Sequence, residues 1–81
     1  KNSIEDEMEE FIFMGLRMVS GISLLKFKRR FGVDIYSIYN KVIEKNIKDG
    51  LLVVEENKMF LTAKGMELSN SVMSDFILDK L

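Results

Sequence analysis

The stretch from Gly50 to Gly65 constrains the fold of this chain most strongly. Its sequence is GLLVVEENKMFLTAKG, in which two short apolar runs flank the polar residues EENK. Such runs on either side of a polar turn predict a β-hairpin with strands at 52–55 and 58–61. Thr62 follows directly and is a good helix N-cap. Because an isolated two-stranded hairpin is marginally stable in water, this hairpin is expected to pack against other elements.

Helical periodicity predicts what the hairpin packs against. Helices are expected at about 4–19, 23–31, 34–49 and 62–79. Ser23 and Asp34 are expected N-caps, and Gly21, Gly32 and Gly50 are expected stops. The predicted fold is therefore mainly α and winged-helix-like, with a three-helix bundle, a two-stranded β-hairpin wing and a C-terminal helix. A plain helical bundle with a loop in place of the hairpin is the structural alternative.

The first predicted helix has more apolar residues than one core face requires. One face is formed at helical spacing by Ile4, Met8, Phe11, Ile12, Gly15 and Val19. Phe13 projects to the opposite side, with Met14 near it and Arg17 one turn further on. Either the fourth helix covers Phe13, or this side contacts another domain or chain. Since aromatic residues, Met and Arg are enriched at interfaces, Phe13, Met14 and Arg17 are candidate docking residues.

Basic residues concentrate between residues 26 and 48. Seven of them stand there against two acidic residues, Asp34 and Glu44, although the whole chain has a net charge of −1. The candidate basic face consists of Lys26, Arg29, Arg30, Lys41, Lys45 and Lys48, with Lys28 beside them. These residues are either a solvated surface, a surface that meets an acidic partner or ligand carboxylates, or a nucleic-acid-binding face.

A nucleic-acid partner is the less favoured of these interpretations. In a winged helix the third helix often enters the DNA major groove, and Lys41, Lys45 and Lys48 share one side of that helix. However, domains that bind DNA alone usually carry a net positive charge. Glu44 would also lie close to the phosphates.

Composition limits the chemistry open to the chain. Its 81 residues suit a single domain, 1–81, and contain neither Cys nor His. This excludes disulfides, Cys/His zinc sites, histidine ligation of heme and a nucleophile–histidine pair. No acid–base pair stands out, so no catalytic, metal or cofactor-binding residue is predicted. There is no apolar run of about 20 residues and no signal-peptide pattern, so a cytoplasmic location is expected. The chain begins at Lys1 and not at Met, which suggests a fragment of a longer protein.

Two blocks of the sequence carry a resemblance to a known family. EEFIFMGLRMVSGISLLKFKRRFG and IKDGLLVVEENKMFLTAKGMELSNSVMSDFI resemble the C-terminal domain of the oxygen-independent coproporphyrinogen III oxidase family. These are radical S-adenosylmethionine (SAM) proteins that include heme-chaperone relatives, and the resemblance covers about residues 9–77. MGLR and LTAKGMELSN are more similar to the chaperone-type branch. The resemblance implies a parent barrel that holds a [4Fe–4S] cluster through a CxxxCxC motif, with SAM beside it. Because this chain has no cysteine, the ligands would lie in an N-terminal part.

The resemblance implies a non-catalytic accessory domain of such a radical SAM protein. The parent would act as an oxidoreductase of the coproporphyrinogen III dehydrogenase type in porphyrin biosynthesis, or would handle heme. The domain would dock on the N-terminal barrel of the same chain through Phe13, Met14 and Arg17, and its basic residues would meet porphyrinogen or heme carboxylates. A winged-helix DNA-binding regulator that uses Lys41, Lys45 and Lys48 is the alternative function. An autonomous enzyme is the least favoured.

Overall fold

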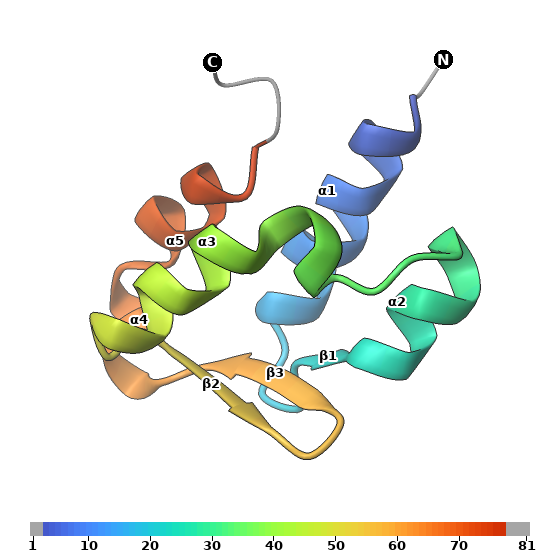
Figure 1. Ribbon diagram of the computed structural model, residues 1–81. Helices are drawn as coiled ribbons and strands as arrows, with labels where there is room; N and C mark the ends of the chain where they lie inside the picture. The colour runs from blue at the N-terminus through green and yellow to red at the C-terminus, as the bar shows by residue number, and fades with distance from the viewer. Residues whose placement is uncertain (1–2, 78–81) are drawn as a thin grey trace.

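The chain forms five helices and a three-stranded antiparallel sheet over residues 3–77, which the computed structural model describes (Figure 1). The elements are α1 (Ile4–Leu16), β1 (Ile22–Ser23), α2 (Leu24–Phe31), α3 (Tyr36–Lys48), β2 (Leu52–Glu55), β3 (Lys58–Leu61), α4 (Ala63–Glu67) and α5 (Ser69–Asp75). The mainly helical class is confirmed, as is the order of three helices followed by a hairpin. In Figure 1 the helix α2 and the pair α4 and α5 lie at opposite sides of the molecule.

The sheet has one strand more than the sequence predicts. β2 and β3 have the expected bounds and pair in the register Leu52 opposite Leu61 and Glu55 opposite Lys58. β1 adds to the other edge of β3, with Ser23 opposite Lys58, so the strand order is β1-β3-β2. A strand of two residues is too short to show an alternating pattern. The third strand therefore leaves no signal in the sequence.

The hairpin turn is bonded to the start of α2 through Asn57. The backbone oxygen of Asn57 accepts a hydrogen bond from the amide of Leu24 at 2.9 Å, and its side-chain Oδ1 accepts one from the amide of Leu25 at 2.9 Å. Its Nδ2 donates to the hydroxyl of Ser23 at 2.9 Å. That hydroxyl accepts from the amide of Lys26, which confirms Ser23 as the N-cap. The hairpin thus satisfies two amides that a helix start leaves unpaired.

One buried cluster joins the helices and the sheet. It consists of Met8, Ile12, Leu16, Ile22, Phe27, Ile35, Tyr39, Ile43, Leu51, Leu52, Met59, Leu61, Val72, Met73 and Phe76. Phe27 stands edge-on to Phe11, with ring centroids 5.7 Å apart, and is tilted against Phe31 at 4.7 Å. The predicted packing of the hairpin against the helices is therefore confirmed, because its inward residues belong to the same cluster as theirs.

The first helix is shorter than the periodicity predicts. It ends at Leu16, and Arg17 is its C-cap. Val19 lies beyond the helix in a turn and is 88% exposed, and Ile4, in the first turn of α1, is 50% exposed. The assignment of both residues to the core face was therefore wrong. Gly21, with φ of 75°, redirects the chain from this turn into β1.

The C-terminal helix predicted for 62–79 is two short helices. Thr62 is confirmed as an N-cap, since its hydroxyl accepts a hydrogen bond from the amide of Gly65 at 2.9 Å. At Leu68 the backbone leaves helical geometry, with φ of −108° and ψ of 28°, and α5 begins in a new direction. The break was not expected because neither Gly nor Pro marks it; the end predicted at Asp79 lies outside the described residues.

The start of α3 also differs from the prediction. Its N-cap is Ile35, which makes no side-chain capping bond, so the assignment of Asp34 was wrong by one residue. Asp34 nevertheless supports this end of the helix, because its Oδ1 accepts a hydrogen bond from the amide of Tyr36 at 2.9 Å. Its backbone oxygen accepts another from the Ser37 hydroxyl at 2.6 Å. Gly50, with φ of 77°, ends the region as predicted.

Tyr39 interrupts α3 in the middle of the core. Its φ of −114° and ψ of 19° are non-helical, and its ring lies 5.2 Å from that of Phe76. Its hydroxyl is buried and has no hydrogen-bond partner in the described part of the chain. Burial, together with the charges of Glu9 and Glu5, raises the pKa of Tyr39 to about 12.

We expect Tyr39→Phe to leave the free energy of unfolding at pH 7 unchanged or to raise it by about 1 kcal/mol, because a buried unpaired hydroxyl is unfavourable. The two proteins should diverge at alkaline pH. Since the folded pKa exceeds that of the unfolded chain, the wild type loses stability on the order of 2 kcal/mol as the pH rises from 10 to 12. The variant lacks this loss.

Urea unfolding at several pH values between 7 and 12 measures the difference. Tyr36→Phe is the control: burial also raises the pKa of Tyr36, but the loss that comes from Tyr39 remains in that variant. A Tyr39→Phe protein that is markedly less stable at pH 7 would show that the hydroxyl has a favourable partner.

Candidate functional site

Two neighbouring grooves follow α1 and share two lining residues. The first, which we call the α1–α2 groove, has a volume of about 580 Å³ and extends from α1 over β1 to α2. The second, the outer groove, has a volume of about 490 Å³ and is lined by residues of α1 and its C-cap alone. Glu10 and Met14 line both.

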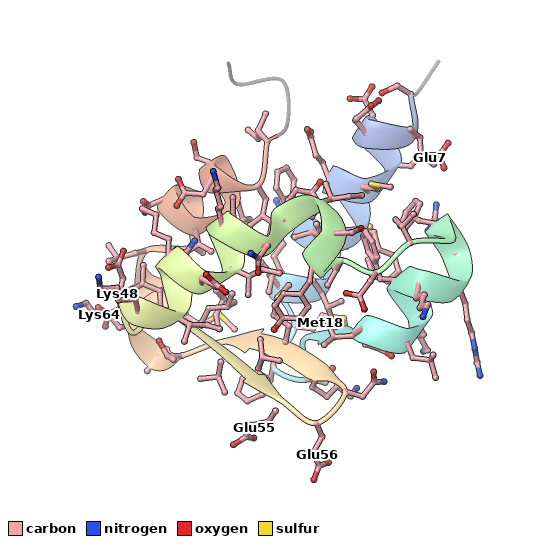
Figure 2. The ribbon with its side chains drawn as sticks, in the orientation of Figure 1. Glu7, Met18, Lys48, Glu55, Glu56 and Lys64 are labelled. Atoms are coloured by element: carbon pink, nitrogen blue, oxygen red, sulfur yellow. The ribbon has the colours of Figure 1, made fainter. Side chains whose placement is uncertain are left out.

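The α1–α2 groove has an apolar floor. Phe11, Met14, Met18 and Ile22 contribute to it, and the two methionines are each 60% exposed. Figure 2 labels Met18 at the end of α1, close to the start of α2 in this view. Gly15 fixes the floor, because a Cβ atom at this position would overlap the side chain of Ile22. The close approach of α1 to β1 at this point therefore requires a glycine.

Charged side chains surround this floor. Arg30 lies 3.9 Å from Glu7 and 5.2 Å above the ring of Phe31, so its charge already has partners. Lys26 and Lys58 also line the groove, and neither forms an ion pair within residues 3–77. Lys58 stands opposite Ser23 in the sheet, which puts it at the end of the groove where α2 begins.

The outer groove brings the candidate docking residues together. Phe13, Met14 and Arg17 all line it. Phe13 is half-buried and packs against the core, whereas Met14 and Arg17 are exposed. The acidic residues Asp6, Glu9 and Glu10 line the same groove nearer the start of α1. The surface thus combines an aromatic edge, a thioether and charges of both signs; that it is a docking surface remains a prediction.

The candidate basic residues fall into two groups. Lys26 and Arg30 line the α1–α2 groove, and Arg29 is exposed on α2 outside both grooves. The other group is on α3, and Figure 2 shows Lys48 at the side of the molecule opposite α2. The two groups therefore do not form one continuous face.

The α3 group is partly neutralised by neighbouring carboxylates. Lys45 Nζ lies 3.0 Å from Asp75 Oδ2 and 3.7 Å from Asp49 Oδ2. The hydrogen bond to Asp75 is the main cause that raises the pKa of Lys45. At the hairpin turn, Glu55 and Glu56 project into solvent (Figure 2). A wing with an acidic tip and a paired lysine on α3 give no support to a DNA-binding role.

Sequence reasoning did not identify Met18 or Lys58 as site residues. Met14 and Met18 are four residues apart, which puts two thioethers on one side of α1 and its following turn, and this spacing is a signal that the sequence contains. Lys58 is different. It reaches the groove only because β1 pairs with β3, and no local pattern predicts that pairing.

The described residues contain no group of three or more Asp, Glu, His or Cys side chains able to hold a metal ion. Among the helices of residues 3–77, none is long and apolar enough to cross a membrane.

The chain is similar to known proteins along most of its length. The family described as HemN C-terminal domain matches residues 2–68. The heme chaperone HemW of Lactococcus lactis subsp. lactis (strain IL1403) is 34% identical over 79 residues, which are 98% of this chain and 21% of that protein. The heme chaperone HemW of Bacillus subtilis (strain 168) is 30% identical over 73 residues, 90% of this chain and 19% of that protein. This chain therefore spans about a fifth of the length of these relatives. No solved structure is a significant match.

Proposed function

Since this chain belongs to the HemN C-terminal domain family, we propose that it is the accessory domain of a longer radical SAM protein that handles heme. The family match over residues 2–68 carries this proposal. Both relatives named above are heme chaperones, which favours the chaperone branch over the oxidase branch. A [4Fe–4S] cluster and SAM would be held by the remainder of the longer protein, because this chain has no cysteine to ligate a cluster. Its location would be the cytoplasm.

The domain docks on the catalytic barrel of the same protein through the outer groove. Phe13 offers a half-buried aromatic edge, and Met14 and Arg17 offer exposed side chains of types enriched at interfaces. The flanking carboxylates of Asp6 and Glu10 would orient a basic residue of the barrel. The domain takes no part in the radical chemistry; it helps to close and shape the site in which the tetrapyrrole is held.

Arg17→Glu tests the docking surface. In the 81-residue chain we expect the free energy of unfolding to change by less than about 0.5 kcal/mol, because Arg17 is exposed. In the longer protein the reversed charge adds to the acidic residues of the outer groove and weakens docking. For each kcal/mol of stabilisation that the domain loses with docking, its melting temperature should fall by about 4–8 °C.

Arg29→Glu is the matched control, since it makes the same charge change on α2 outside both grooves. Thermal melts and limited proteolysis of the chain and of the longer protein separate the effects. If Arg17→Glu and Arg29→Glu change the melting temperature and the proteolysis of the longer protein equally, docking through the outer groove is refuted.

A further inference from the structure

We propose that the α1–α2 groove seats an amphipathic helix of the same protein, formed by the segment that precedes α1. This inference rests on the proposed function, because it needs the longer protein of which this domain is one part. The groove itself supplies the position of the helix, its direction and the side chains that it must carry.

The floor of the groove suits the apolar face of a helix. Phe11, Met14, Met18 and Ile22 line it, and the two methionines are each 60% exposed. Methionine side chains are flexible and polarisable, and they are common where a protein surface receives an amphipathic helix. The lining extends along α1 from Glu7 to Met18, roughly 16 Å at the rise of an α-helix, which is the length of about three turns.

The two ends of the groove differ in charge. Lys26 and Lys58 lie at the end where α2 begins, and neither has a carboxylate partner within residues 3–77. Glu7 and Glu10 lie toward the start of α1, where Arg30 is 3.9 Å from Glu7. A helix that complements the groove would carry acidic residues at the lysine end, an apolar stripe over the floor and a basic residue at the acidic end.

The attachment of the longer protein gives the direction of the helix. This chain spans about a fifth of the length of its relatives, and its family is described as a C-terminal domain, so in the proposed longer protein the remainder precedes α1. In Figure 1 the start of α1 lies away from the sheet. A helix that ends there runs antiparallel to α1 and has its N-terminus at the lysine end. Acidic residues in the first turn of a helix are stabilising, so those that pair with Lys26 and Lys58 would also stabilise the bound helix.

Covalent attachment makes up for the small size of the groove. Antiparallel helices are typically joined by about 2–5 residues, so the bound helix would lie within about 20 residues of the start of α1. A segment tethered so closely has an effective concentration in roughly the millimolar range, which is enough to fill a weak site. Met14 and Met18, which are exposed in the 81-residue chain, would then be covered in the longer protein.

A synthetic peptide that contains this segment and ends at the residue before Lys1 tests the proposal. It is titrated into the 81-residue chain, whose methionine methyl groups are isotopically labelled for NMR. We expect the signals of Met14 and Met18 to shift, and those of the buried Met59 and Met73 to remain in place. No shift of the groove methionines at roughly millimolar peptide would overturn the proposal.

Charge reversal tests the direction of the helix. Lys26→Glu with Lys58→Glu should weaken binding of the peptide roughly tenfold, because the reversed charges repel its acidic residues. Lys48→Glu with Lys64→Glu is the matched control, since neither residue lines either groove, and we expect it to leave the affinity unchanged. Circular dichroism checks that each variant is folded. Equal affinities of the two double variants would overturn the antiparallel placement.

Photo-cross-linking identifies the segment that lies in the groove of the longer protein. With p-benzoylphenylalanine in place of Met18, we expect a cross-link within one molecule to the segment directly before α1. The same substitution of Met66, an exposed methionine of α4 outside both grooves, is the control and should not give this product. A cross-link from position 18 to another part of the protein or to a second copy, or the absence of any cross-link, would overturn the proposal.

Docking and occupation of the groove can fail separately. Arg17, which tests docking, does not line the α1–α2 groove, and Met18, Lys26 and Lys58 do not line the outer groove. A longer protein that is unchanged by Arg17→Glu would refute docking through the outer groove and leave the cross-link from position 18 standing.

Discussion

Replacing Phe27 with alanine is expected to lower the free energy of unfolding by about 3–5 kcal/mol. Phe27 is fully buried, and its ring contacts those of Phe11 and Phe31 at centroid distances of 5.7 and 4.7 Å. The substitution leaves a cavity where α1 and α2 meet. For a domain of 81 residues, whose whole stability is roughly 4–12 kcal/mol, this loss is enough to leave much of the protein unfolded.

Urea unfolding followed by circular dichroism measures this effect. Leu25→Ala, on the same helix and 46% exposed, is the control, and we expect it to cost about 1 kcal/mol or less. A Phe27→Ala protein that unfolds like the Leu25→Ala protein would mean that the aromatic cluster does not form the centre of the α1–α2 contact.

Gly21→Ala is expected to destabilise the protein by about 2–5 kcal/mol. Gly21 has φ of 75°, a left-handed conformation that costs an alanine roughly 1–2 kcal/mol. A Cβ atom would also overlap the backbone oxygen of Met59 and lie 2.6 Å from Cβ of Phe60. Such overlap typically adds about 1–3 kcal/mol. Because Met59 and Phe60 belong to β3, the substitution would push the chain before β1 away from the sheet.

Gly32→Ala separates the two contributions. Gly32 has nearly the same φ, 76°, but no atom lies within 4 Å of a Cβ built there. We therefore expect Gly32→Ala to cost only the conformational part, roughly 1–2 kcal/mol. If thermal and urea unfolding give equal losses for both variants, the close contact at Gly21 does not contribute to stability.

The sequence predicts the parts of this fold that depend on neighbours along the chain. The hairpin strands, the N-caps Ser23 and Thr62 and the stop at Gly50 follow from local side-chain chemistry, and the structure has them at those positions. The break at Leu68 has a different origin. It lies in a run without Gly or Pro, and Val72 and Phe76 enter the core after it. Such a change of direction depends on packing between distant residues, which local propensity does not encode.

The same division applies to the candidate site. Phe13, Met14 and Arg17 could be grouped from helical spacing, and they do line one groove. The basic residues could be assigned to the second and third helices, but only the fold shows that the two groups do not form one continuous face. Pairing of Lys45 with Asp75 also joins residues thirty positions apart. Spacing along one helix can be read from the sequence, whereas contact between helices cannot.

The bonds from Asn57 to the start of α2 have a consequence for how the domain opens. In most helices the first turn frays, so its amide hydrogens exchange rapidly with solvent. Here the amides of Leu24 and Leu25 are held by a residue more than thirty positions away. Their exchange requires the hairpin turn to move off α2, so both amides should exchange at the same slow rate as those within the hairpin. The wing and α2 would then open as one cooperative unit, and the groove end that Lys58 and Lys26 share would keep its shape until that unit opens.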